Sequence, residues 1–243
     1  MKSSQSTREL FSWKINIIDN MSYYKNFGLI LSNPLWRVYL RWRYQRSIDD
    51  FKKLNFSPSF SKKDFTCLLC GVGNEVTAEE FVKFVLKRNS DPNIWMIDLG
   101  KEQIDAVKQM VIRKFPNLNI KVMQIDALKL ESLIKKHTVD WIETDGLFEF
   151  FDNASIRKLL NIWKQLLTKE GFITTTATSS RWKLQEYFDN VKIWAGKVWL
   201  GVVVYPHTRA QMRQNFKAVG LKFVEGPTML PYFKRYSLIQ DPI

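Results

Sequence analysis

The sequence predicts an α/β protein with a seven-stranded, mostly parallel sheet that helices cover on both faces and that ends in an antiparallel hairpin. From residue 65 onward, strand-like apolar runs alternate with amphipathic helical segments, which is the pattern of a parallel sheet. The first run, 65–70, leads directly into the turn Gly71-Val72-Gly73. The last two runs, 221–224 and 232–239, follow each other through Gly226-Pro227, so we expect them to pair as a hairpin.

The composition favours an intracellular globular protein. The chain has 243 residues, enough for one large domain or for a core with an appendage, and 45% of them are hydrophobic. No run approaches the ~20 apolar residues of a membrane span, and the polar start of the chain lacks the apolar region of a secretory signal. We therefore expect a cytoplasmic protein. No pattern in the sequence indicates an oligomeric state.

The two cysteines, Cys67 and Cys70, lie next to the glycine turn. Their spacing occurs in redox pairs and in zinc sites, but there is no second cysteine pair, and the two histidines, His137 and His207, lie far away in the sequence. We therefore expect no metal site, and we interpret Cys67 as a buried strand residue.

The net charge of +13 is concentrated at the two ends of the chain. Residues 1–64 contain 12 Lys and Arg against 5 Asp and Glu, residues 65–177 contain 15 of each kind, and residues 178–243 contain 10 against 4. This asymmetry indicates either an anionic partner or substrate that the flanks meet, or a basic surface that is simply solvated.

Residues 1–64 are predicted to be mostly helical. Asn33-Pro34 is a helix start, since Asn caps a helix and Pro suits its first position. One helix face then carries Leu35, Val38, Tyr39 and Trp42, while Arg37, Arg41 and Arg43 lie off it. An earlier short helix is expected around Phe11, Ile15 and Ile18. We interpret 1–64 as a cap over a substrate pocket, an arm on an acidic surface, or a helical extension packed on the core; 57–64 is the linker.

The central segment supplies the repeating strands and helices. After the glycine turn come a helix around 81–86, a strand at 94–97, a helix at 101–114, a strand at 120–124, a short helix around 130–134, a strand at 139–144, a helix at 153–168 capped by Asp152 or Asn153, and a strand at 172–177. A stop signal, Lys169-Glu170-Gly171, separates the last two. Ligands of such sheets bind at the carboxyl ends of the strands.

Residues 178–205 interrupt this alternation with an insertion rich in aromatic residues: Trp182, Tyr187, Phe188, Trp194, Trp199 and Tyr205. Because the insertion follows the fifth strand, we expect it near the ligand end of the sheet. A helix at 208–219, with Met212, Phe216 and Val219 inside, then precedes the hairpin.

The glycine turn and Asp98 together indicate a nucleotide-type site. Glycine lets the backbone approach a ligand closely, because no Cβ stands in the way. Asp98 ends the second strand, where its carboxylate can accept hydrogen bonds from both hydroxyls of a ribose. The third glycine of a dinucleotide fingerprint is replaced by Val76, which favours adenosine over a pyrophosphate.

These motifs, in this order, resemble class I S-adenosylmethionine-dependent methyltransferases, which have a Rossmann-like fold. The resemblance rests on Cys70-Gly71-Val72-Gly73, Asp98, Asp126-Ala127, residues 140–148, residues 167–172 and Ala218-Val219-Gly220-Leu221, and it covers roughly 65–177 and 206–243. It implies a methyltransferase domain over 65–243 and S-adenosyl-L-methionine as the cofactor. The residues it assigns to cofactor binding are Cys70, Gly71, Val72, Gly73, Glu75, Asp98, Leu99, Asp126, Ala127, Thr144 and Asp145.

One departure from the family pattern affects the cofactor's ammonium group. The family usually has an acid near the end of the first strand and a further glycine before the turn, and here Cys67 and Leu69 take those places. Glu75 is included above because it can partly substitute for the missing acid.

Methyl transfer from a sulfonium needs few catalytic side chains. The sulfonium already activates the methyl group, so the protein mainly positions the reactants. An oxygen nucleophile can need a general base, whereas a carboxylate acceptor needs none. Candidate catalytic groups are Glu143, Asp145, Glu149 and His207. Structural roles compete for three of them: Asp145 as a turn cap, Glu149 as a solvated helix residue and His207 as the start of a helix.

The acceptor is predicted from what the sequence lacks and from one stretch that it has. Signature motifs of common nucleic-acid methyltransferases are absent, and residues 146–152 resemble those of small-molecule methyltransferases. We therefore expect an oxygen, carboxylate or nitrogen nucleophile on a small-molecule or lipid-like, amphiphilic and anionic acceptor, with contact to a membrane surface as an option. The alternatives are an RNA or protein methyltransferase that uses its basic flanks, and a non-catalytic binding protein on a degenerate fold.

Overall fold

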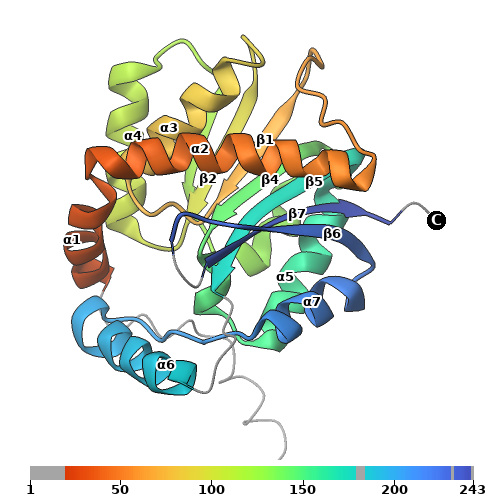
Figure 1. Ribbon diagram of the computed structural model, residues 1–243. Helices are drawn as coiled ribbons and strands as arrows, with labels where there is room; N and C mark the ends of the chain where they lie inside the picture. Colours follow the sequence, from red (N-terminus) through yellow and green to blue (C-terminus); the bar gives the residue numbers. More distant parts are fainter. Residues whose placement is uncertain (1–19, 179–183, 231–232, 242–243) are drawn as a thin grey trace, which may run out of the picture.

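The structure is a computed structural model that describes residues 20–178, 184–230 and 233–241 (Figure 1). Seven strands form one sheet: β1 (Thr66–Cys70), β2 (Asn93–Asp98), β3 (Ile120–Gln124), β4 (Val139–Asp145), β5 (Leu167–Thr178), β6 (Leu221–Pro227) and β7 (Phe233–Gln240). Their order is β3-β2-β1-β4-β5-β7-β6. Strands β1 to β5 are parallel to one another, and β7 is antiparallel to both β5 and β6. The predicted parallel sheet with a C-terminal hairpin is confirmed.

The sheet has a switch point between β1 and β4. From β1 the chain adds β2 and then β3 on one side, and it returns to place β4 on the other side of β1. Crossover loops therefore leave in opposite directions at the carboxyl ends of these two strands, which opens a crevice there. The glycine turn follows β1 and Gly146 follows β4, so both border this crevice.

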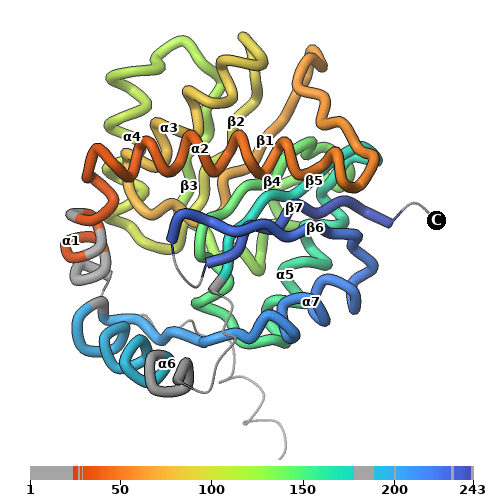
Figure 2. Tube along the Cα trace, viewed as in Figure 1, coloured from red at the N-terminus to blue at the C-terminus, as the bar shows by residue number. Residues whose placement is uncertain are grey.

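Helices cover both faces of the sheet (Figures 1 and 2). The helical elements are α1 (Asn20–Leu31), α2 (Pro34–Asp50), η2 (Phe51–Leu54), α3 (Glu75–Leu86), α4 (Lys101–Lys114), η3 (Ala127–Ser132), η4 (Leu147–Phe150), α5 (Asn153–Leu166), α6 (Leu184–Ala195), the π-helical turn η5 (Gly196–Leu200) and α7 (Arg209–Ala218). Helices α2, α3 and α4 pack on one face, and α5 and α7 with η3 on the other. Among the described residues, no helix is both long and apolar enough to cross a membrane.

Helix α2 begins where the sequence predicts, with the Asn33 side chain accepting a hydrogen bond from the Leu35 amide. Only part of the predicted hydrophobic stripe faces the core: Tyr39 is buried and Trp42 is half-buried. Leu35 and Val38 are 76% and 54% exposed, whereas the fully buried residues of the helix include Leu40, Arg43 and Tyr44. The reason is that the face toward the sheet carries polar groups with partners on distant strands. The pattern of hydrophobic residues along the helix does not indicate that polar groups on distant strands will pair with Arg43 and other polar residues of α2.

Two other boundaries differ from the predictions. Helix α5 ends at Leu166 rather than 168, because Leu167 already pairs with Val139 of β4; a register shift then precedes the pairing of Phe172 with Trp141, so the predicted stop lies inside β5. Likewise Gly226-Pro227 lie within β6 instead of forming the turn.

The short helix expected around 130–134 is the 3₁₀ turn η3, which begins earlier and leaves Leu133 exposed. Asp152 is the cap of α5, accepting from the Ser155 amide. Phe11, Ile15, Ile18 and Trp182, and the side chains of Tyr187 and Phe188, lie outside the described residues.

Candidate functional site

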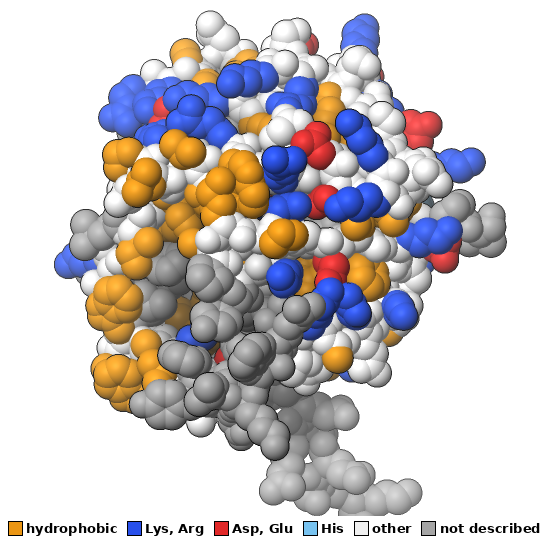
Figure 3. All heavy atoms as spheres, viewed as in Figure 1, with side chains coloured by type: hydrophobic (Ala, Val, Ile, Leu, Met, Phe, Trp, Pro, Cys, Tyr) orange, Lys and Arg blue, Asp and Glu red, His pale blue; other side chains and the backbone are white. Residues whose placement is uncertain are grey.

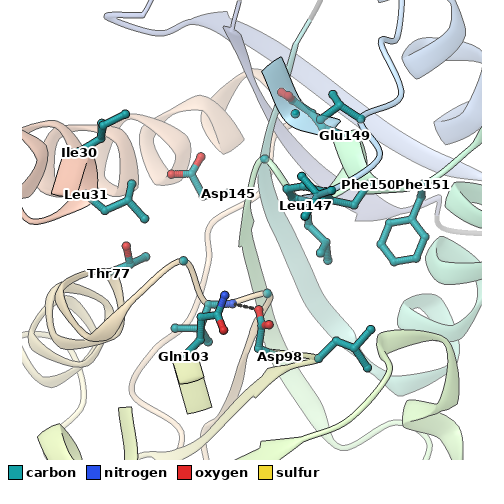
Figure 4. Close-up of a pocket in the computed structure, with 18 of the residues that line it drawn as sticks. Ile30, Leu31, Thr77, Asp98, Gln103, Asp145, Leu147, Glu149, Phe150 and Phe151 are labelled. Carbon is teal, nitrogen blue, oxygen red and sulfur yellow. Dashed lines mark hydrogen bonds between the residues drawn. The ribbon is translucent and has the colours of Figure 1, made fainter. Parts of the chain in front are cut away.

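A cavity of about 490 Å³ lies at the carboxyl ends of β1, β2 and β4 (Figure 4). Its volume is within the ~300–1,000 Å³ of small-molecule sites. The loops after these strands and after β3 form one part of the wall. Most of the rest comes from α1, the first turns of α2, the segment from α6 to residue 204, and Leu230 and Phe233 near the hairpin. Both predicted flanks, 1–64 and 178–205, therefore contribute to the cavity wall.

The glycine turn borders the cavity, and a side chain at either of its glycines would meet a neighbouring residue. Gly71 has φ +81°, and a Cβ there would lie 3.0 Å from Leu147 Cδ1. A Cβ on Gly73 would lie 2.6 Å from Leu31 Cδ1 of α1. A larger residue at Gly71 would be strained by the backbone conformation and by this contact. The absence of side chains at both residues therefore keeps this border of the cavity open.

Asp98 lies at the end of β2 and braces this loop. Its Oδ2 accepts a hydrogen bond from the Val72 amide and its Oδ1 from the Gly100 amide, both at 2.7 Å. Burial raises the pKa of Asp98 to about 6, against the opposing effect of the amides of Gly100, Val72 and Leu99. The carboxylate and Leu99 also line the cavity. In Figure 4, Asp98 lies beside Gln103.

Asp126 and Ala127, which follow β3, have different positions relative to the cavity. Asp126 caps η3, where its side chain accepts from the Leu128 amide at 2.9 Å, and it is not among the cavity-lining residues. Ala127 and the preceding Ile125 do line the cavity.

The end of β4 carries two carboxylates on the same side of the strand, since side chains alternate with period two. Glu143 is fully buried and does not reach the cavity: its Oε1 accepts from Arg43 Nη1 at 2.6 Å and its Oε2 from the Thr174 hydroxyl. Burial raises the pKa of Glu143 to about 7, against the charge of Arg43. Asp145, at the strand's last position, does line the cavity and accepts from the Thr176 hydroxyl. Thr144 is buried away from the cavity.

Glu149 lines the cavity from the turn after β4 and connects that turn to the aromatic insertion. Its Oε2 lies 3.4 Å from Lys192 Nζ of α6, and its carbonyl oxygen accepts from the Tyr205 amide at 2.6 Å. Among the described lining residues, Lys192 is the only Lys or Arg, whereas three carboxylates, Asp98, Asp145 and Glu149, face the same cavity.

His207 does not line the cavity. Its Nε2 lies 3.0 and 2.9 Å from the carbonyl oxygens of Phe148 and Phe151, so the ring donates to both and fixes the turn after β4. Burial lowers the pKa of His207, against the opposing effect of its hydrogen bonds to Phe148 and Phe151. This position gives His207 a structural role next to the site.

Two other predicted residues lie outside the cavity wall. Cys70 is buried in β1, and burial raises the pKa of its thiol. Glu75 begins α3 and its Oε2 accepts a hydrogen bond from the Tyr24 hydroxyl of α1 at 2.9 Å. The structure thus places Glu75 in a helix–helix contact. Within the described part of the chain, no cluster of three His, Cys, Asp or Glu side chains could hold a metal ion.

Sequence reasoning missed several parts of the wall. Ile30 and Leu31 of α1 and Trp36 of α2 line the cavity, as do Leu230 and Phe233 near the hairpin. The sequence signal for the α2 residues was present, because Asn33-Pro34 places a helix start there. Nothing in the local pattern indicates that this start meets the glycine turn.

Comparisons with known proteins agree on the architecture. No family model matches the sequence, and no curated protein sequence matches it either. Among solved structures, magnesium protoporphyrin IX methyltransferase from Synechocystis PCC 6803 with bound SAH superposes with a TM-score of 0.62 at 11% identity, over 91% of this chain and 95% of that one. Geranyl diphosphate C-methyltransferase from Streptomyces coelicolor A3(2) gives 0.59 at 12% identity, over 82% and 79%.

A third solved structure, mitomycin 7-O-methyltransferase, gives a TM-score of 0.55 at 9% identity over 73% of this chain. The match spans about half, 49%, of that longer protein. At sequence identities this low, the superpositions establish a shared architecture and do not establish an activity. The strand order, the hairpin and these superpositions agree: the chain has the class I S-adenosylmethionine-dependent methyltransferase fold.

Proposed function

We propose that the protein binds S-adenosyl-L-methionine in this cavity and transfers its methyl group to a small-molecule acceptor. The observation that carries the proposal is that the Gly71–Gly73 loop and the Asp98 carboxylate border one cavity at the switch point of the sheet. The residues present fit the cofactor: the loop lacks side chains that would block it, Asp98 offers acceptor atoms to ribose hydroxyls, and Leu99 and Ala127 offer apolar surface to adenine.

The cofactor's ammonium group needs an acid, and Asp145 is the one we assign. Cys67 and Leu69, which take the places of the family's usual acid and glycine, are fully buried in the sheet. Glu75 is engaged with Tyr24 and lies outside the wall. Asp145 lies in the wall at the end of β4, where the resemblance places the methionine part of the cofactor, and its side chain is 14% exposed.

The acceptor end of the cavity is apolar. Ile30, Trp36, Trp199, Val202 and Phe233 contribute to it. Figure 3 shows hydrophobic side chains gathered on the side of the molecule where α1 and α6 lie, next to a cluster of Lys and Arg. Trp194, Val198 and Trp199 are all at least half exposed there. These features support an apolar or amphiphilic, lipid-like acceptor.

Charge inside the cavity restricts the acceptor further. Three carboxylates against one lysine disfavour a polyanion within the cavity, so the basic flanks do not by themselves favour RNA. Glu149, held by Lys192, is the group we assign as general base for an oxygen or nitrogen nucleophile. The neighbours that are named for mitomycin, magnesium protoporphyrin and geranyl diphosphate methylation also act on small molecules.

Calorimetry with S-adenosylhomocysteine tests the cofactor assignment, and mass analysis of the purified protein tests for a retained cofactor or acceptor. We expect saturable one-to-one binding. Absence of binding to folded protein would overturn the proposal. Binding without methyl transfer to any apolar hydroxyl, amine or carboxylate acceptor would favour a non-catalytic binding protein. Strong, salt-dependent RNA binding with methyl incorporation into the RNA would favour an RNA methyltransferase instead.

A further inference from the structure

A buried cluster of charges links helix α2 to the cavity wall. Arg43, in the middle of α2, is fully buried and donates from Nη1 to Glu143 Oε1 at 2.6 Å. Its Nε lies 3.8 Å from Oδ2 of Asp145. The guanidinium carbon also lies 4.6 Å from the centre of the Tyr44 ring. Of the two carboxylates that face Arg43, Asp145 is the one that also faces the cavity.

Stability alone is a weak reason for burying this cluster. Taking charges out of water is costly, and replacing a buried ion pair by apolar residues of similar volume is often neutral or stabilising. The cluster also has two carboxylates for one guanidinium. A second buried pair on α2, between Asp50 and Arg235 Nη2 at 2.6 Å, already fixes the far end of the helix to β7 and does not touch the cavity.

We propose that Arg43 is a positioning residue that holds the Asp145 carboxylate in the orientation that receives the cofactor's ammonium group. Glu143 anchors the guanidinium by a hydrogen bond, and the charge of the guanidinium then attracts Oδ2 of Asp145 across 3.8 Å without a direct hydrogen bond. The Thr176 hydroxyl restrains the other oxygen, Oδ1. Helix α2 is in this way part of the cofactor site. The inference rests on the proposed function, because it needs a cofactor with an amino-acid end.

The test compares two ligands on the full chain. S-adenosylhomocysteine carries the ammonium group, and 5′-methylthioadenosine shares the adenosine part but lacks it. The variant is Arg43→Met combined with Glu143→Gln, so that neither member of the fully buried Arg43–Glu143 pair is left as an unpaired charge. We expect the Kd for S-adenosylhomocysteine to rise about tenfold or more, which corresponds to about 1.4 kcal/mol, and the Kd for methylthioadenosine to change by less than about twofold.

Four further variants separate positioning from stability. Asp50→Asn with Arg235→Met removes the other buried pair of α2; it should lower the melting temperature and leave the ratio of the two Kd values unchanged. Arg43→Lys retains the positive charge. Its ratio of the Kd for S-adenosylhomocysteine to the Kd for methylthioadenosine should therefore lie between that of the original protein and that of the variant with Arg43→Met and Glu143→Gln. Asp145→Asn should reproduce the ligand-specific loss, and adding it to the Arg43 and Glu143 changes should cause little further loss, because the groups act as one unit.

The outcomes distinguish a failure of the proposed cofactor site from a failure of the positioning role of Arg43. If the unmodified protein binds neither ligand, the proposed function fails. If it binds both, and the Arg43 and Glu143 changes weaken both equally or weaken neither, the cofactor site stands and the positioning role of Arg43 is overturned. The same holds if the control variant of the Asp50 pair changes the ratio to the same extent.

Discussion

Replacing Asp98 by Ala removes the side chain that connects the glycine loop to the proposed ribose site. In the structure the carboxylate spans the Val72 and Gly100 amides, with both hydrogen bonds at 2.7 Å. Two ribose hydroxyls would add two further charge-assisted bonds. Hydrogen bonds to charged groups contribute about 1.5–3 kcal/mol each. Because part of this is offset by desolvation of the carboxylate, we expect a total loss of about 2–4 kcal/mol, a rise in Kd of about 30- to 1,000-fold.

The fold should survive this change. Two loop amides lose a partner, but the variant also no longer buries a carboxylate whose pKa burial raises to about 6. These effects oppose each other, so we expect a shift in melting temperature below about 5 °C. Asp98→Asn is the matched control for shape: its amide oxygen can still accept one backbone hydrogen bond, while its charge is lost. It should bind the cofactor more weakly than the original protein and more strongly than the Ala variant.

Calorimetric titration with S-adenosylhomocysteine measures the change, and circular dichroism shows whether the variant is folded. A folded Asp98→Ala protein with unchanged affinity would refute the reasoning, because Asp98 would then have no part in binding. Equal loss of affinity and of helical signal would mean that the Ala variant is unfolded. The affinity of the Asp98→Asn variant for S-adenosylhomocysteine would then show whether Asp98 takes part in binding.

Three further predictions follow from the same geometry. Gly71→Val should abolish cofactor binding in a protein that remains partly folded, since φ is +81° and a Cβ would lie 3.0 Å from Leu147; normal titration of this variant would show that the loop is not the binding loop. Cofactor affinity should fall as pH drops through about 6, because protonated Asp98 accepts ribose hydroxyls poorly, and a titration series between pH 5 and 8 that is flat would contradict this. The raised pKa also means that burial of Asp98 costs the free protein more stability as pH rises from about 4 to 6. Trp199→Ala should raise the KM for an apolar acceptor while the Kd for S-adenosylhomocysteine stays within about twofold, and equal changes in both constants would place Trp199 against the cofactor instead.

Local patterns were enough to predict the strands, most helices and the glycine turn after the first strand. Glycine turns and strand ends are set by neighbours in the sequence, so Gly71, Gly73 and Asp98 could be placed without a structure. Their meeting at one cavity follows from the carboxyl ends of parallel strands sharing one edge of the sheet.

The inner face of α2 could not be predicted, because its burial depends on partners far away in the chain. Arg43 is buried since Glu143, one hundred residues later, accepts its hydrogen bond. The same limit applies to the candidate acids. Glu143 and Asp145 differ by two positions on one side of β4, and only the place where the strand ends decides which of them reaches the cavity.

A crystal structure grown with S-adenosylhomocysteine is the most direct measurement of the central claim. We expect density for the ligand in the cavity, with both ribose hydroxyls on the Asp98 carboxylate, the amino-acid chain of the ligand along Gly71–Gly73, and the ammonium group next to Asp145. Ligand density at another place on the protein, or an adenosine group that makes no contact with Asp98, would contradict it.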